Sequence, residues 1–137
     1  MLDNEALQAL ADRHHPKHRG MLEKIAAVTY ESRRGVSVRV VTPTAVRVEA
    51  LVSRQAAGTA TLGRFQVQDV PLDGARADRC VTLAAAATAT VVDTTVAEAA
   101  ESQAGTRRVS IYTADVADLT RLVGHVEHAP RVRVRLI

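Results

Sequence analysis

Histidine is the residue type in this sequence best suited to holding a transition metal, and it occurs in two separate groups. The histidines are His14, His15, His18, His125 and His128. Two histidines four residues apart share one helix face, as a zinc pair requires, but Pro16 interrupts a regular helix in the first group. No CxxC or HExxH pattern accompanies either group. We therefore expect solvated and helix-end histidines, with no metal site and no cofactor.

Nucleophiles and paired carboxylates give equally weak signals of catalysis. Cys80 is the only cysteine, and it opens an expected strand without a neighbouring histidine, as a small buried hydrophobic residue does. The sequence has no GxSxG elbow, no GxGxxG and no phosphate-binding P-loop. The closely spaced acidic pairs, Asp115 with Asp118 and Glu98 with Glu101, suit helix capping and solvation. We expect no catalytic residue and a non-enzymatic protein.

Arginine accounts for 16 of the 18 basic residues, and it marks the candidate binding surface. Side chains on one face of a strand lie about 7 Å apart, close to the step between phosphates. The candidate partner-binding residues are Arg107, Arg108, Arg131, Arg133 and Arg135. Arginine recognises carboxylates and phosphates through its planar fork. The alternative is that GC-rich codon usage supplies the arginines and that they cover a solvated sheet face.

These arginines belong to residues 107–137, which have the pattern of a strand, a helix and a second strand. Asp115 can cap the helix, and Pro130 ends it. Aliphatic residues alternate with arginines in the last strand, so one face is expected to be buried. A helix between two strands predicts a right-handed crossover packed on a sheet. The helix has its apolar stripe at Val116, Leu119, Leu122, Val123 and Val126.

The preceding chain is expected to contain two helices and then a sheet. Residues 2–15 and 21–31 are predicted helices, separated by the sequence HHPKHRG. Asp3 or Asn4 can cap the first of them. Together they form an N-terminal helical arm, residues 1–34, which either packs on the sheet or projects toward a partner.

Residues 35–137 are expected to form one α+β domain with four strands before the C-terminal unit. Alternation predicts strands at 36–41 and 64–70, and at 45–55, where the spacing also fits a helix. β-Branched residues favour a further strand at 80–92, although Ala84–Ala87 is good helix material. The Thr95-x-x-Glu98 capping box predicts a short helix ending at Gly105. The fold class is therefore α+β: two N-terminal helices, then a mainly antiparallel sheet of about five or six strands with a C-terminal β-α-β unit. This architecture resembles ferredoxin-like and ACT-like domains.

Length and composition limit the functions worth considering. The chain of 137 residues fits one domain, its formal net charge is +3, and no run of about 18 apolar residues spans a membrane. The first residues do not resemble a secretory signal, so we expect a cytoplasmic protein or one within a virion-like assembly. The expected function is a self-associating interaction or assembly module, such as a subunit of a phage-like particle. The alternatives are an ACT-like regulatory domain for a small ligand, and nucleic-acid binding by an arginine-lined sheet face.

Overall fold

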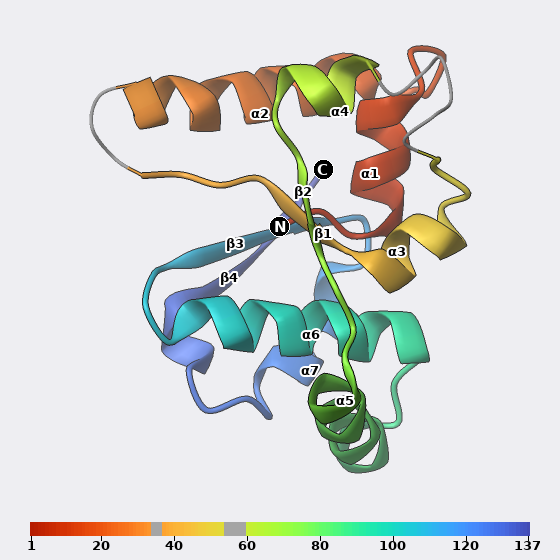
Figure 1. Ribbon diagram of the computed structural model, residues 1–137, viewed down its shortest axis with the longest axis vertical. Helices are drawn as coiled ribbons and strands as arrows, with labels where there is room; N and C mark the ends of the chain where they lie inside the picture. Colours follow the sequence, from red (N-terminus) through yellow and green to blue (C-terminus); the bar gives the residue numbers. More distant parts are fainter. Residues whose placement is uncertain (34–36, 54–59) are drawn as a thin grey trace.

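A computed structural model describes residues 1–33, 37–53 and 60–137, which are mainly helical (Figure 1). Its α-helices are α1 (Asn4–Ala11), α2 (His18–Arg33), α3 (Thr44–Glu49), α4 (Ala60–Arg64), α5 (Gly74–Ala87), α6 (Val91–Ala104) and α7 (Val116–Val123). A short 3₁₀ helix, η2 (Ala129–Arg131), precedes the last strand. The strands are β1 (Val41–Pro43), β2 (Gln68–Val70), β3 (Val109–Thr113) and β4 (Val132–Leu136).

The strands pair in parallel, β1 with β2 and β3 with β4, and residues 1–3 join the two pairs. The Leu2 N–H donates to the Val41 carbonyl at 2.8 Å, and the Asp3 N–H donates to the Tyr112 carbonyl at 3.2 Å. Leu2 also pairs with Tyr112 in the parallel sense. The spatial order is therefore β2, β1, residues 1–3, β3 and β4. In chain order this is third, second, first, fourth, fifth, the arrangement of a doubly wound α/β sheet.

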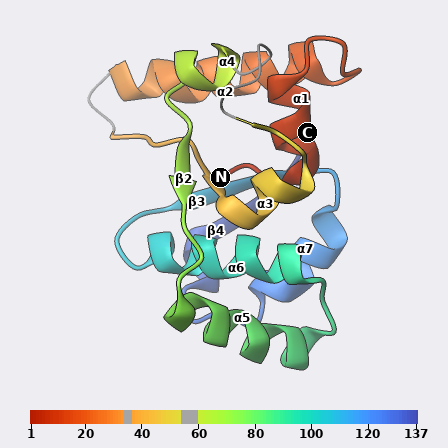
Figure 2. The same ribbon diagram turned by 45° about the vertical axis from the view of Figure 1, so that its right-hand side comes forward.

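Helices cover both sides of this strand layer. Figures 1 and 2 show α1, α2 and α4 on one side and α5, α6 and α7 on the other. Helix α6 is the central helix of its layer, because residues 94–100 are all buried. The largest fully buried apolar side chains are Leu2, Leu7, Leu10, Met21, Ile25, Val46, Leu62, Val96, Ile111, Leu119 and Leu122. They come from both helical layers and the strands, so a single apolar core holds the three layers together.

The expected α+β fold with a mainly antiparallel, ferredoxin-like or ACT-like sheet is wrong. Every strand pairing within the described residues is parallel, and the strands are short, two of them with only three residues. Parallel strands need helical crossovers, and the chain supplies them in segments that were predicted to be strands. The ACT-like regulatory reading was based on that sheet and is not retained.

Of the strands predicted in the first half of the domain, one is largely a helix and two are shorter than predicted. Residues 44–49 form α3, and the predicted strand at 64–70 is confined to β2. Of the strand predicted at 36–41, only Val41 belongs to a strand among the described residues. Residue 36 of this prediction, and residues 54 and 55 of the strand predicted at 45–55, lie outside the described residues. Val46 is buried whereas Val48 is exposed, so the alternation of valines in α3 did not correspond to one buried strand face.

The strand predicted at 80–92 is also wrong, because α5 continues to Ala87 and α6 begins at Val91. Alanine has the highest helix propensity of any residue type, and the four alanines at Ala84–Ala87 outweigh the β-branched residues beside them. Thr88 ends α5 in the left-handed conformation, at φ 49°. Helix α6 starts at the Thr90 cap, five residues before the expected capping box. No single described helix is long and apolar enough to cross a membrane; α5 and α6 meet that criterion only as a pair bent by 115°.

The terminal predictions are confirmed. Helices α1 and α2 lie within or close to the expected ranges, and Asp3 caps α1 by accepting a hydrogen bond from the Ala6 N–H. The β-α-β unit is present as β3, α7 and β4, with Asp115 capping α7. Val132 is buried and Arg133 and Arg135 are exposed, as expected, but Leu136 at the end of β4 is exposed as well.

Candidate functional site

Several helices begin at the edge of the sheet where the parallel strands end. Residues 1–3 lead into α1, β1 leads into α3 and β3 leads into α7, while α6 begins on the same side of the molecule (Figure 1). The strand order reverses here, because the chain moves from residues 1–3 to β1 on one side and β3 lies on the other. In open parallel sheets, ligands bind outside the carboxyl ends of the strands at such a switch point.

Asp3 is at the centre of this edge. Its Oδ1 accepts a hydrogen bond from the Ala6 N–H at 3.0 Å, which caps α1. Burial raises the pKa of the Asp3 carboxyl; hydrogen bonds from Thr113 and Ala6 oppose this, and the nearby charges of Glu5 and Asp93 raise the pKa further. Asp3 therefore lies in a partly buried, acidic environment that disfavours its ionised form, although the N-terminal ammonium of Met1 also interacts with its charge.

Asp93 and Asp115 come to the same edge from the starts of α6 and α7. Asp93 N–H donates to the Thr90 hydroxyl at 3.1 Å, and that hydroxyl donates to Asp93 Oδ2 at 2.6 Å. Asp115 Oδ1 accepts from the Asp118 N–H at 3.1 Å. Asp115 caps α7 with one carboxylate oxygen, whereas Asp93 is held by the Thr90 hydroxyl that caps α6. Local structure therefore fixes the position of both carboxylates.

Asp3, Asp93 and Asp115 make this side of the sheet its acidic edge, and Asn4 and Glu49 extend it toward α3. Asn4 Nδ2 donates to Glu49 Oε2 at 2.5 Å, which links the first turn of α1 to the last residue of α3. The Asn4 Oδ1 atom is buried and has no hydrogen-bond partner among the described residues. An unpaired buried carbonyl oxygen is costly, and a cation or an ordered water would satisfy it. Glu5 is different, because Lys17 neutralises it through an ion pair of 2.6 Å.

Carboxylate and amide oxygens are the ligands that Mg²⁺ prefers in proteins. The carboxylate oxygens at this edge do not come within 4.8 Å of one another as a set of three. Among the described residues, one set of three His, Cys, Asp or Glu side chains is that compact: Glu101, Glu127 and His128. Mg²⁺ keeps several waters and often contacts only one or two carboxylates directly. The arrangement therefore suits a hydrated cation that bridges the aspartates to an anionic ligand.

From the sequence, Asp3 and Asp115 were predicted only as helix caps, and Asp93 was not predicted as a site residue. The positions of Asp3 and Asp115 in the chain share one signal. Asp3 directly follows Leu2, which pairs with β3, and Asp115 lies two residues after the end of β3. Asp93 lacks this signal, because it lies in the first turn of α6, which follows helix α5 and not a strand. Cys80 is buried, and burial, followed by the charge of Glu98, raises the pKa of its thiol. A thiol held in its neutral form is a poor nucleophile.

The five arginines predicted to bind a partner do not share one face. Arg107 and Arg108 line a cavity at the opposite edge of the sheet, where the strands begin. Arg131 lies in η2 before β4 and donates to the carbonyls of Ala104 and Gly105 at 3.1 and 2.8 Å, at the C-terminus of α6.

The remaining two arginines, Arg133 and Arg135, project from β4. Arg135 Nε donates to Ser110 Oγ at 3.2 Å across the strand pair, and Arg133 is exposed. Their surface is therefore smaller than the expected row of arginines.

The two histidine groups are not part of one three-ligand set among the described residues. His18 Nδ1 lies 2.8 Å from the Ala9 carbonyl, and His128 Nδ1 lies 2.5 Å from Glu101 Oε1. The His128 N–H also donates to Glu101 Oε2 at 2.9 Å, so this pair holds the loop after α7 against α6.

No family model, curated protein or solved structure matches this chain. Its function is therefore inferred from the geometry of the molecule.

Proposed function

We propose that the protein hydrolyses phosphodiester bonds in nucleic acid, with a divalent cation held by Asp3, Asp93 and Asp115. The observation that carries this proposal is that three aspartates lie in the first turns of α1, α6 and α7 at the switch point of a parallel sheet, Asp3 and Asp115 as N-caps and Asp93 bound to the Thr90 cap. Fixed carboxylates at such a position are what a hydrolytic site needs to place a cation beside a phosphate.

The electrostatics support a cation at this edge. Burial and the charges of Glu5 and Asp93 raise the pKa of Asp3, so its ionised form is disfavoured in the free protein. A divalent cation would offset the repulsion between these carboxylates and would supply a partner for the buried Asn4 Oδ1. Each aspartate already has one oxygen held by a hydrogen bond, from a backbone N–H at Asp3 and Asp115 and from the Thr90 hydroxyl at Asp93, so little side-chain freedom is lost on binding.

A polyanionic substrate fits the charge distribution. The chain has a formal net charge of +3, so its overall field attracts polyanions, while the site itself is acidic. A phosphate can approach carboxylates only when a cation lies between them. The cation then polarises the phosphoryl oxygen and lowers the pKa of a bound water. This requirement favours phosphodiesters over neutral substrates.

The proposed reaction is an in-line displacement by water. A cation held by Asp3, Asp93 and Asp115 would supply an activated water, and a carboxylate of the site would accept the proton of that water as its oxygen bonds to phosphorus. The P–O bond opposite the attacking oxygen breaks, and the leaving alkoxide takes up a proton from solvent. The products are one phosphate monoester and one free hydroxyl.

Fluorescently labelled single-stranded RNA and DNA, incubated with Mg²⁺ or Mn²⁺, test this activity directly. Asp3→Asn, Asp93→Asn and Asp115→Asn should each lower the cleavage rate at least about tenfold, as loss of a group that holds or orients a metal does. Asparagine caps helices about as well as aspartate, so the helices should persist. EDTA should abolish cleavage.

Asp73→Asn is the matched control. Asp73 caps α5 with the same geometry, accepting from the Arg76 N–H at 2.9 Å, but α5 begins away from the acidic edge. This variant should cleave like the wild type. Absence of cleavage by the wild type with either cation, or equal cleavage by Asp3→Asn, would disprove the proposal.

We also propose that the protein self-associates through α3 and Leu51, two residues after its end. Val48 and Leu51 are 74% and 90% exposed, although both are large and apolar. Leu51 moreover adopts a left-handed backbone conformation, with φ 54°. An exposed leucine in a conformation that leucine rarely adopts suggests a role in contact with a second copy.

A further inference from the structure

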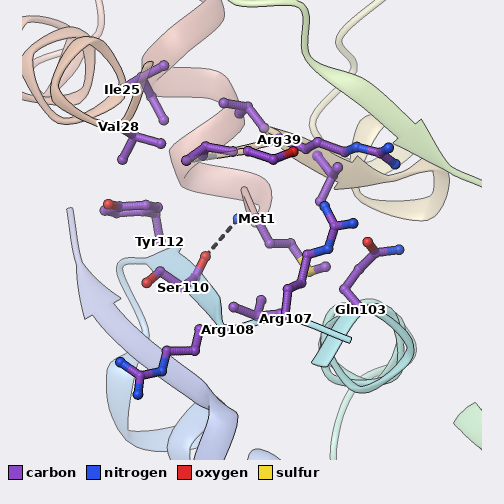
Figure 3. A pocket seen from close by; sticks show the side chains of 14 residues that line it. Met1, Ile25, Val28, Arg39, Gln103, Arg107, Arg108, Ser110 and Tyr112 are labelled. Carbon is purple, nitrogen blue, oxygen red and sulfur yellow. Dashed lines mark hydrogen bonds between the residues drawn. The ribbon is translucent and has the colours of Figure 1, made fainter. Parts of the chain in front are cut away.

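A cavity of about 390 Å³ lies at the edge of the sheet where the strands begin, opposite the acidic edge (Figure 3). Its walls come from α2, the segment leading into β1, the end of α6 and the start of β3. The volume falls in the range of small-molecule sites. It is therefore a separate site from the aspartates at the carboxyl ends of the strands.

One wall of the cavity carries guanidinium groups. Figure 3 shows the Arg39 and Arg107 side chains reaching toward the same side of the cavity, near the Gln103 amide, while Arg108 points away from them. The Arg107 Nη1 atom is buried and has no hydrogen-bond partner among the described residues. A buried guanidinium nitrogen without an acceptor is rare and costly. It indicates that an anionic acceptor belongs at this wall.

The other walls are apolar. Ile25 and Val28 of α2 and the Tyr112 ring lie across the cavity from the two guanidinium groups (Figure 3). Ile25 is fully buried, so this side is part of the core surface and keeps its shape. A ligand that fills the cavity needs an anionic group at one end and a flat or apolar body at the other.

We propose that this cavity binds a phosphate monoester carried on an aromatic body, with the phosphate at Arg39 and Arg107 and the body against Ile25, Val28 and Tyr112. A carboxylate is satisfied by the fork of a single arginine. A phosphate monoester carries a charge of about −1.5 to −2 and three acceptor oxygens, which matches two arginines and an amide. The apolar wall then accounts for the rest of the volume.

Isothermal titration calorimetry in EDTA tests binding without any cation-dependent hydrolysis, so failure here is distinct from failure of the proposed activity. The probes are adenosine monophosphate, phenyl phosphate, adenosine and inorganic phosphate. Adenosine monophosphate or phenyl phosphate should bind with a Kd on the order of 10–100 µM. Adenosine and inorganic phosphate should each bind at least about tenfold more weakly, since each lacks one of the two recognised parts.

The two phosphate esters distinguish the source of the ligand. Tighter binding of adenosine monophosphate identifies a nucleotide, and tighter binding of phenyl phosphate identifies a smaller aromatic ester. Either result supports the proposal. Inorganic phosphate or adenosine binding as tightly as the esters, or no binding by any probe, overturns it.

Arg107→Gln locates the site, and Arg133→Gln is its control. Both changes remove one positive charge, but Arg133 is exposed on β4 and does not line this cavity. Arg107→Gln should weaken ester binding at least about tenfold, and Arg133→Gln should leave it unchanged. Arg39→Gln gives a second readout if Arg107→Gln does not fold. Unchanged ester binding in either cavity variant overturns the assignment.

Discussion

The backbone N–H of Asp115 donates a hydrogen bond to the Thr113 hydroxyl at 2.8 Å. Thr113 is the last residue of β3 and is fully buried. The same hydroxyl hydrogen-bonds to the Asp3 carboxyl and lowers its pKa against the larger effect of burial. One hydroxyl thus joins two of the three aspartates proposed to hold a cation, and it makes Thr113 a positioning residue of the site.

Thr113→Val should weaken cation binding and lower stability. Valine keeps the shape of threonine, but the Asp115 N–H loses its acceptor and Asp3 loses a donor. The free energy of unfolding should fall by about 1–2 kcal/mol, as for a buried hydrogen bond. Mn²⁺ should then raise the melting temperature less than it does in the wild type. Thr113→Ser keeps the hydroxyl and should restore the Mn²⁺ effect, whereas equal responses of wild type and Thr113→Val would show that the hydroxyl does not position the site.

Asp3→Asn should raise the melting temperature near neutral pH in the presence of EDTA. Burial raises the pKa of the Asp3 carboxyl above its usual value in the folded state. The stability contributed by such a group is present below the unfolded-state pKa and is lost as pH rises through the folded-state pKa. Ionised Asp3 therefore destabilises the protein at neutral pH, and asparagine removes that cost while keeping the cap.

The pH dependence provides the check on Asp3. The advantage of Asp3→Asn over the wild type should shrink as the pH falls toward the carboxyl range, where Asp3 takes up its proton. Asp73→Asn, at an exposed cap, should alter stability by no more than about 0.5 kcal/mol. A destabilised Asp3→Asn protein at neutral pH would mean that the Asp3 charge is already compensated.

The parts of the fold that could be predicted from sequence are those where two signals agree. In residues 107–137, alternation and a capping aspartate indicate the same strand-helix-strand unit, and β3, α7 and β4 confirm it. The helix ends at Val123, however, so Pro130, which lies in η2, does not end it as predicted. In residues 80–92, alanine and β-branched residues gave opposite indications, and the helix propensity of the alanines prevailed, with only Cys80 and Ala87 of this segment buried. Residues 1–3 are too short to show a strand pattern, so the central position in the sheet was not predictable.

That missing strand explains why the candidate site was overlooked. Asp3 is a catalytic candidate only once residues 1–3 lie between β1 and β3, because only then does it share an edge with Asp115. As a helix cap in an N-terminal arm it carried no such meaning. The arginine pattern was visible from the start, yet the tertiary fold divides it, with Arg107 in the cavity and Arg131 at the end of α6.

Arg79→Met should lower the melting temperature by leaving a buried charge poorly compensated. Glu98 on α6 is 2% exposed, and Arg79 holds its Oε1 through Nε at 3.0 Å and Nη2 at 2.6 Å. The remaining cation, Arg76, lies 3.8 Å from the other carboxylate oxygen. A buried carboxylate that loses its main partner is strongly destabilising.

The double variant Arg79→Met with Glu98→Leu separates this charge effect from lost packing. Replacing both members of a buried pair by apolar residues is often neutral, so the melting temperature should recover above that of Arg79→Met alone. Arg19→Met is the surface control, because Arg19 and Glu23 form an exposed pair and should contribute almost nothing. A double variant less stable than Arg79→Met would show that Glu98 stabilises the fold independently of Arg79.

Leu51→Asn should reduce self-association without loss of stability. Leu51 is 90% exposed and has φ 54°, a conformation that asparagine adopts more readily than leucine. In a free monomer the substitution therefore removes an exposed apolar side chain and relieves backbone strain. Light scattering of the wild type should give a mass above that of one 14.7 kDa chain, and Leu51→Asn should move it toward the monomer. Leu72→Asn, at another exposed leucine outside α3, is the matched control and should keep the wild-type mass. A monomeric wild type would instead disprove self-association and show that Val48 and Leu51 face solvent.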